Sequence, residues 1–86
     1  MENTEQIAQI KVLILKKINL NSLRLEDCKY MSEQIFVKTK NYLSAHTIQT
    51  IFIADSTILT PFVLNSLAQF CGFADWEDYI RKTRED

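Results

Sequence analysis

The chain contains a single glycine and a single proline among its 86 residues. Turns and flexible connections depend on these two residue types, so their scarcity disfavours long loops, collagen-like repeats and a many-turned β-sandwich. A glycine-rich loop that would cradle a phosphate group is excluded for the same reason. The longest uninterrupted apolar runs have four residues, Val12 to Leu15 and Ile51 to Ala54, and are too short to span a membrane.

Cysteine and histidine are also scarce. Cys28 and Cys71 lie far apart, and His46 is the only histidine. A structural zinc site needs four ligands at close spacing, so we expect no metal site and no cofactor. Both cysteines fall on apolar faces of predicted helices, where a free cysteine behaves as a small hydrophobic residue. We therefore expect buried, reduced thiols.

The overall composition is that of a globular domain. Apolar residues make up 47% of the chain and charged residues 24%, with a net charge of −1. This length predicts one domain over residues 1–86, and the sequence leaves open whether that domain is the N-terminal module of a longer protein. The first residues, Met1 to Gln6, are acidic and polar, unlike a signal peptide. The expected location is the cytoplasm, with no membrane attachment.

Apolar residues recur at three- and four-residue spacing in five segments, as is typical of amphipathic helices. The first four predicted helices are residues 4–19, 26–39, 45–53 and 61–71, and the fifth begins at residue 76. A short strand over residues 11–16 stays open as an alternative within the first segment. The predicted fold class is therefore all-α, a five-helix domain.

Local signals mark several ends of these helices. Ser44 and Thr60 carry hydroxyl groups that can cap a helix start, and Pro61 suits a first helical position. Gly72 can end the fourth helix, and Asp75 can cap the fifth. The core is expected to contain Ile35, Ile48, Phe52, Leu64, Leu67, Ala68 and Trp76.

The second half of the chain carries an ordered set of residues. They are Leu43, Ser44, Thr47, Leu64, Asn65, Leu67, Ala68, Phe70, Gly72, Phe73, Asp75, Trp76, Glu77 and Tyr79. With the preceding segment Ser32 to Phe36, this stretch resembles the helix-turn-helix core of Cro/CI-type phage repressors. It looks closer still to a helix-turn-helix-like N-terminal module of Bacteroidetes proteins. The resemblance implies a helix-turn-helix-like core made by the second, third and fourth helices, and a regulatory role.

DNA binding through the third helix is one function that the resemblance implies. Gln49 could read an adenine edge, with His46 and Thr50 beside it on the outer side. Phosphate contacts would come from Lys38 and Lys40. Gln49 and Thr50, however, stand where the module often has a basic pair, and there is no Lys or Arg from residue 41 to residue 80. Because such residues supply most phosphate contacts, sequence-specific DNA binding is the alternative rather than the leading hypothesis.

Surplus apolar residues on the first helix indicate the leading function. Val12 and Leu13 lie outside its main apolar stripe, and Leu15 widens that stripe. A helix that is apolar on more than one side is usually covered on both. The cover could be the fifth helix, a second copy of the chain or another domain. Apolar area near the second helix could also be left exposed, at Tyr30, Val37 and Tyr42.

No catalytic constellation is present: there is no paired histidine motif, no nucleophile with a nearby base and no carboxylate dyad. We therefore expect no enzyme and no small-molecule substrate. The predicted function is a non-catalytic interaction or regulatory module that contacts a protein partner, or a second copy in a homodimer, through Val12, Leu13 and Leu15.

Overall fold

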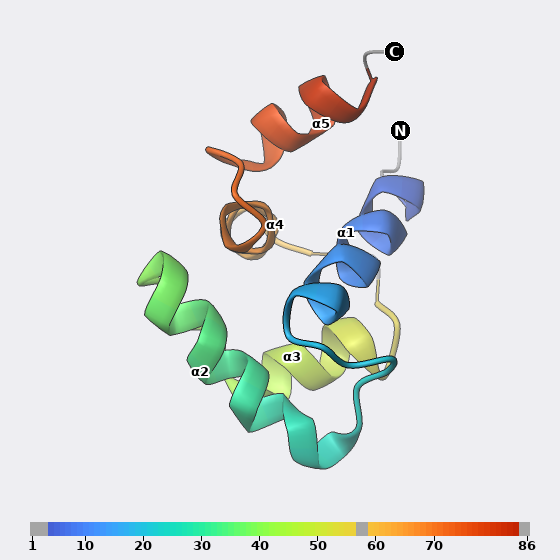
Figure 1. The fold of residues 1–86 in the computed structure, drawn as a ribbon, viewed down its shortest axis with the longest axis vertical. Coiled ribbons are helices and arrows are strands. Elements are labelled where there is room, and N and C mark those ends of the chain that lie inside the picture. Colours follow the sequence, from blue (N-terminus) through green and yellow to red (C-terminus); the bar gives the residue numbers. More distant parts are fainter. Residues whose placement is uncertain (1–3, 57–58, 85–86) are drawn as a thin grey trace.

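The computed structural model describes residues 4–56 and 59–84, and this part of the chain is helical without a strand (Figure 1). It contains five α-helices, which confirms the predicted all-α class. They are α1 (Thr4–Lys17), α2 (Cys28–Thr39), α3 (Ala45–Phe52), α4 (Pro61–Phe70) and α5 (Trp76–Arg84), and a short 3₁₀ helix, η1 (Leu25–Asp27), precedes α2. Residues 11–16 are helical, so the strand alternative for this segment is wrong.

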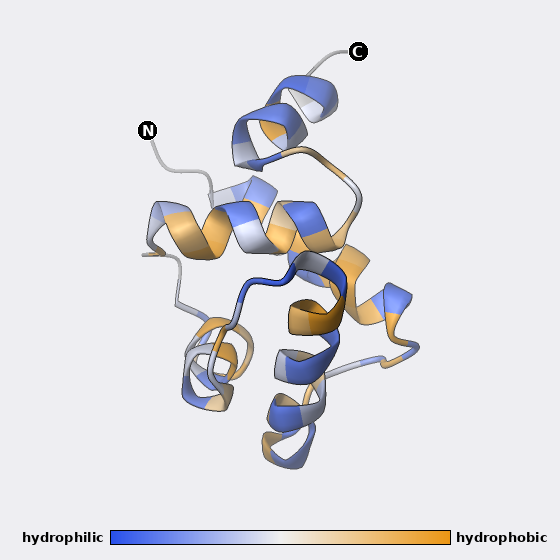
Figure 2. Ribbon diagram, turned by 90° about the vertical axis from the view of Figure 1, so that its left-hand side faces the viewer, coloured by the Kyte–Doolittle hydropathy of each residue, from blue (hydrophilic) through white to orange (hydrophobic). Residues whose placement is uncertain are grey.

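Helix α4 is the central element. It packs against α1, α2 and α5, and α3 packs against α2 (Figure 1). Figure 2 shows α5, the helix that leads to the C-terminus, as mostly hydrophilic with a few hydrophobic residues. The attachment of α5 to the rest of the molecule therefore depends on few apolar side chains.

The buried core draws on all five helices. Of the residues expected in it, Ile35, Ile48, Leu67, Ala68 and Trp76 are buried. Leu64 and Phe52 are partly buried and pack against this core. Phe52 is the last residue of α3, where fewer neighbours surround a side chain, and Leu64 borders a surface hollow beside Trp76.

The predicted starts of α3 and α4 are confirmed by hydrogen bonds. The Ser44 hydroxyl oxygen accepts from the backbone N–H of Thr47 at 3.1 Å, and that of Thr60 accepts from Val63 at 3.3 Å. Each bond satisfies a donor that the first helical turn leaves without a partner. Pro61 occupies the first turn of α4, where its missing N–H is harmless.

The connection between α4 and α5 also follows its sequence signals. Gly72 has a φ of 99°, which a side chain rarely tolerates, and the N–H of Phe73 returns to the carbonyl of Ala68 at 3.0 Å. Asp75 then accepts from the backbone N–H of Asp78 at 2.8 Å. The reversal of the chain is thus fixed by one glycine and one side-chain cap.

Four predicted helix bounds differ from the structure: α3 and α4 each end one residue earlier than predicted, and α1 and α2 each differ by two residues. α1 ends at Lys17 rather than at Asn19, because Asn19 adopts a left-handed conformation with a φ of 65°. α2 begins at Cys28 rather than at Glu26, because the preceding three residues form the tighter turn η1. Short polar segments of this kind compete locally with the α-helix.

Two residues of α5, Tyr79 and Asp78, make polar contacts that fix this helix and its first turn. The Tyr79 hydroxyl donates to the carbonyl of Gln6 in α1 at 3.1 Å, which joins the two ends of the chain. The Asp78 carboxylate accepts from the N–H of Ala74 at 2.9 Å and pairs with Arg81 at 3.1 Å and with Lys82 at 3.5 Å. The pKa of Asp78 lies below its usual 3.8, mainly because of the hydrogen bond from Ala74 and also because of the two cations.

Acidification should therefore destabilise the first turn of α5. Because the folded pKa of Asp78 is depressed, its stabilising contribution is complete above the unfolded pKa and is lost as the pH falls through the folded pKa. We expect the urea concentration at the midpoint of unfolding to decrease as the pH is lowered from about 5 to about 2. The Asp78→Asn variant should flatten this dependence.

A second carboxylate provides the control for the pH experiment. The pKa of Asp55 is also lowered, by its hydrogen bond and ion pair with Lys11 of α1. An Asp55→Asn variant should remove a separate part of the acid dependence. A pH profile that changes with Asp55→Asn but not with Asp78→Asn would contradict the proposed role of Asp78.

Candidate protein-interaction surface

The α1 surface predicted from the sequence is small. Val12 and Leu13 are exposed, at 52% and 38%, as their positions outside the apolar stripe indicated. Leu15, in contrast, is half-buried and packs against the core. The predicted contact residues of α1 therefore include only two side chains that are free for a partner.

Helix α2 and the segment after it expose a larger apolar area. Its residues are Tyr30, Phe36, Val37 and Tyr42, called here the α2 surface, and Val37 and Tyr42 are both 64% exposed. The sequence singled out three of these but placed Phe36 at the edge of the buried face. The buried side of α2 is set by Met31 and Ile35, and it is narrow enough to leave Phe36 outside.

Two adjoining hollows lie on the α2 surface. The first has a volume of about 340 Å³ and is lined by Ser32, Glu33, Gln34, Phe36, Val37 and Tyr42. The second has a volume of about 380 Å³ and is lined by Lys17, Ile18, Tyr30, Gln34, Val37, Lys38 and Phe70. Gln34 and Val37 line both hollows, so the two adjoin along α2 with these side chains between them.

The backbone beneath the first hollow is held in place. Lys40 adopts a left-handed conformation with a φ of 67° and ends α2. The buried hydroxyl of Ser32 donates to the carbonyl of Leu43, which holds the connection after α2 against that helix. The Asn41 side chain donates to Gln69 of α4 at 2.8 Å. Tyr42 is thus an exposed side chain on an anchored segment.

An aromatic pair forms one wall of the first hollow. The rings of Phe36 and Tyr42 lie 6.5 Å apart between centroids, at an angle of 76°. This edge-to-face geometry is favourable for aromatic pairs and restricts both side chains before a partner arrives. Preformed order of this kind reduces the entropy cost of binding.

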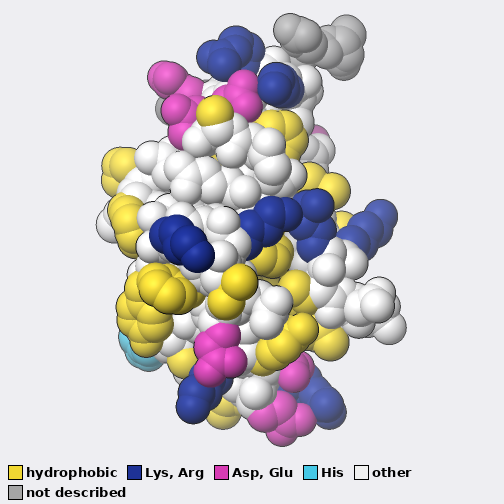
Figure 3. All heavy atoms as spheres, turned by 60° about the vertical axis from the view of Figure 1, so that its left-hand side comes forward, with side chains coloured by type: hydrophobic (Ala, Val, Ile, Leu, Met, Phe, Trp, Pro, Cys, Tyr) yellow, Lys and Arg dark blue, Asp and Glu magenta, His cyan; other side chains and the backbone are white. Residues whose placement is uncertain are grey.

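Two lysines border the second hollow. The Lys38 ammonium group lies 5.6 Å from the centre of the Phe70 ring, a cation–π contact, and Lys17 comes from the last turn of α1. Both act on the neighbouring Cys71 thiol: burial raises its pKa to about 11, while the two positive charges oppose that rise. In Figure 3, dark blue basic side chains cross the middle of this face, with yellow hydrophobic side chains next to them.

Both cysteine thiols are free, as the sequence predicted. Cys28 is buried, but Cys71 is only half-buried, which corrects the expected burial of the second thiol. Cys71 lies directly beyond the end of α4.

The residues considered for DNA binding differ in exposure and in contacts. His46 is exposed, whereas Gln49 and Thr50 are half-buried, and the Thr50 hydroxyl donates to the carbonyl of His46 at 3.1 Å. Lys38 lies over Phe70 of α4, and the Lys40 ammonium donates to the carbonyl of Val37 at 3.4 Å. Neither lysine interaction involves α3.

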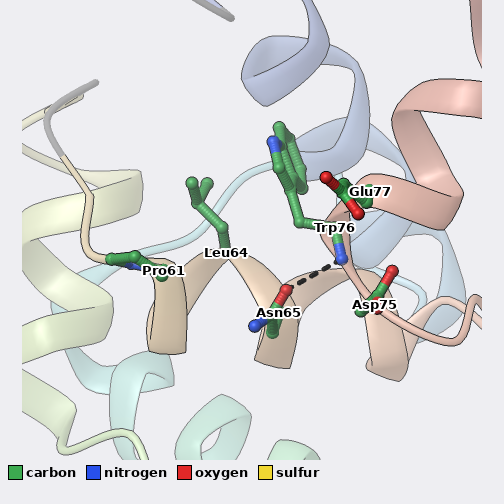
Figure 4. A pocket seen from close by; sticks show the side chains of 6 residues that line it. All are labelled: Pro61, Leu64, Asn65, Asp75, Trp76 and Glu77. Atoms are coloured by element: carbon green, nitrogen blue, oxygen red, sulfur yellow. Dashed lines mark hydrogen bonds between the residues drawn. The ribbon is translucent and has the colours of Figure 1, made fainter.

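A further hollow lies between α4 and α5 (Figure 4). It has a volume of about 330 Å³ and is lined by Pro61, Leu64, Asn65, Asp75, Trp76 and Glu77. The Asn65 side-chain oxygen accepts from the backbone N–H of Trp76 at 2.9 Å. The indole Nε1 of Trp76 has no hydrogen-bond partner among the described residues and is out of contact with solvent. This hollow marks the joint between two helices.

The described residues include no group of three or more His, Cys, Asp or Glu side chains that could hold a metal ion. Within the same part of the chain, none of the helices combines the length and the apolar character that a membrane span requires.

Comparison with known protein families, curated proteins and solved structures finds no match for this chain. The resemblance of residues 32–80 to repressor-like helix-turn-helix modules therefore stays a prediction.

Proposed function

We propose that this chain is a non-catalytic interaction module that binds a protein partner through the α2 surface. The observation that carries the proposal is the group of exposed apolar side chains on the α2 surface, which line two adjoining hollows. Contiguous apolar area of this kind marks interaction sites on proteins, and aromatic residues are enriched in interfaces. The anchored segment that carries Tyr42 supports the proposal, because a preformed site costs less entropy to occupy.

The proposal does not extend to DNA binding. α3 and α4 contain no Lys or Arg, and contacts to phosphate oxygens depend mainly on those two residue types. Lys38 and Lys40, the residues considered for phosphate contacts, precede α3 and lie outside it.

A charge placed in the α2 surface should abolish partner binding. Helical peptides selected from a display library on the immobilised chain provide the probe, and fluorescence anisotropy measures their affinity. We expect Val37→Glu to weaken the selected peptides by at least about tenfold, because a carboxylate would be desolvated in the contact. Val37 is largely exposed, so the variant should fold normally.

The matched control is Val12→Glu, which places the same charge on the exposed side of α1. Binding should survive this change. Loss of binding with Val12→Glu alone would move the contact to α1, and binding that ignores Val37→Glu would overturn the proposal for α2. Circular dichroism on both variants checks that helix content is unchanged.

Self-association through α1 is a separate expectation from Val12 and Leu13. We expect the chain to form a homodimer at high micromolar concentration, and Leu13→Glu to convert it to a monomer with unchanged helicity. A biological contact of this kind should bury about 1,000 Å² or more in total. Sedimentation velocity measures the change, and a monomeric parent chain would contradict the expectation.

A further inference from the structure

The second hollow on the α2 surface has a charge of one sign at its border. Lys17 arrives from α1 and Lys38 from α2, and both line the hollow beside Tyr30 and Val37. A lysine in the last turn of a helix also stabilises the helix dipole. That role does not explain why two ammonium groups from different helices border the same hollow.

No Asp or Glu is among the residues that line the second hollow. Glu33 lines the first hollow and not the second. Glu26 pairs with Arg24 at 3.1 Å, at the opposite end of α2 from Lys38. The contact of Lys38 with Phe70 holds its ammonium group over the end of α4, where it remains largely exposed. The positive charge is therefore available to a ligand.

The shape of the surface indicates the conformation of that ligand. Tyr30, Gln34 and Val37 follow the i, i+4, i+7 spacing, so they form one row along α2 over about 10 Å. A row of this kind is complementary to the apolar row of a second helix laid alongside it. An extended peptide would instead pair with a strand edge, and the described residues contain no strand.

We infer that the partner of the α2 surface is an acidic amphipathic helix. Its apolar row covers Tyr30 and Val37, and carboxylates at the border of that row pair with Lys17 and Lys38. This inference rests on the proposed function and adds the conformation and the charge of the partner.

Synthetic peptides of equal length test the inference. The first is an amphipathic helix with leucines in one row and glutamates elsewhere, the second replaces each glutamate by lysine, and the third scrambles the acidic peptide so that the row is lost. We expect the acidic helix to bind at least tenfold more tightly than either of the others. Its affinity should fall steeply towards about 1 M salt, where the screening length is only about 3 Å.

Charge reversal on the protein identifies the lysines. In the double variant Lys17→Glu, Lys38→Glu, the acidic helix should lose affinity by at least tenfold, and the lysine-containing helix should gain. Lys29→Glu is the control: this lysine is exposed on the same helix but lines neither hollow. Equal losses in the control and the double variant would overturn the assignment to Lys17 and Lys38.

The outcomes separate the inference from the proposed function. Three results would each contradict the inference of an acidic helical partner. They are no binding of the acidic helix, tighter binding of the lysine-containing helix, and equal binding of the scrambled peptide. If the lysine-containing or scrambled peptide binds and this binding is lost in Val37→Glu, the proposed interaction surface stands. If no bound peptide depends on Val37→Glu, both are overturned.

Discussion

Replacement of Leu67 by alanine should lower the free energy of unfolding by about 2–5 kcal/mol. Leu67 has no exposed surface and lies in α4, the helix that contacts α1, α2 and α5. The substitution removes apolar burial and leaves a cavity that surrounding helices can only partly fill. Because a small domain has a total stability of about 5–15 kcal/mol, the loss is a large share of it.

Urea unfolding followed by circular dichroism measures the effect of Leu67→Ala. The control on the same helix is Phe62→Ala, because Phe62 is 52% exposed and stands outside the core. Its effect should stay near about 0.5 kcal/mol, as for most surface substitutions. A Leu67→Ala variant no less stable than Phe62→Ala would contradict the central position of α4 in the core.

Loss of the Tyr79 side chain should be as damaging as the loss of Leu67. Tyr79 is fully buried, with the Trp76 ring at 5.0 Å and the Phe73 ring at 5.1 Å between centroids. We expect Tyr79→Ala to cost about 3–5 kcal/mol, which is typical of a large aromatic side chain truncated in a core. Because α5 is mostly hydrophilic, few other contacts can hold it in place (Figure 2).

The milder variant Tyr79→Phe separates burial from hydrogen bonding. It keeps the ring contacts and removes only the bond from the hydroxyl to the carbonyl of Gln6. The expected cost is about 1 kcal/mol, measured by the same urea titration. If Tyr79→Phe is as destabilising as Tyr79→Ala, the bond to α1, and not the aromatic packing, holds α5.

The helix ends that were predicted correctly depend on local chemistry. Ser44, Thr60 and Asp75 each bond to a backbone N–H three residues further on, so the sequence alone contains both partners. Gly72 acts through its own φ angle. The end of α1 was wrong because the left-handed conformation of Asn19 is rare for residues other than glycine and gives only a weak signal.

The extent of burial was harder to predict, because it depends on residues distant in the sequence. Phe36 and Leu64 are apolar residues at suitable helical positions, and the spacing does not show that neighbouring helices leave them partly uncovered. The link between Asn41 and Gln69, which lie 28 residues apart, has no sequence pattern either. Such contacts appear only when the packing of the helices is known.

The candidate interaction surface was predicted only in part. Val12 and Leu13 stood out because they interrupt the polar side of α1, and both are exposed. The α2 surface was indicated by Tyr30, Val37 and Tyr42, but the two hollows beside them were not predicted. Lys17 and Phe70, from α1 and α4, complete the second hollow, and no periodic pattern links them to α2.

The hydrogen bond between Tyr79 and Gln6 joins residues that are 73 positions apart, so nearly the whole chain is the loop that this contact closes. In an unfolded chain, closing a loop of that length would cost about 4 kcal/mol of entropy from its logarithmic length dependence alone. Helices α1 to α4 shorten the effective loop once they have packed. We therefore expect α5 to dock last during folding, and on the ribosome only after the C-terminal segment has emerged.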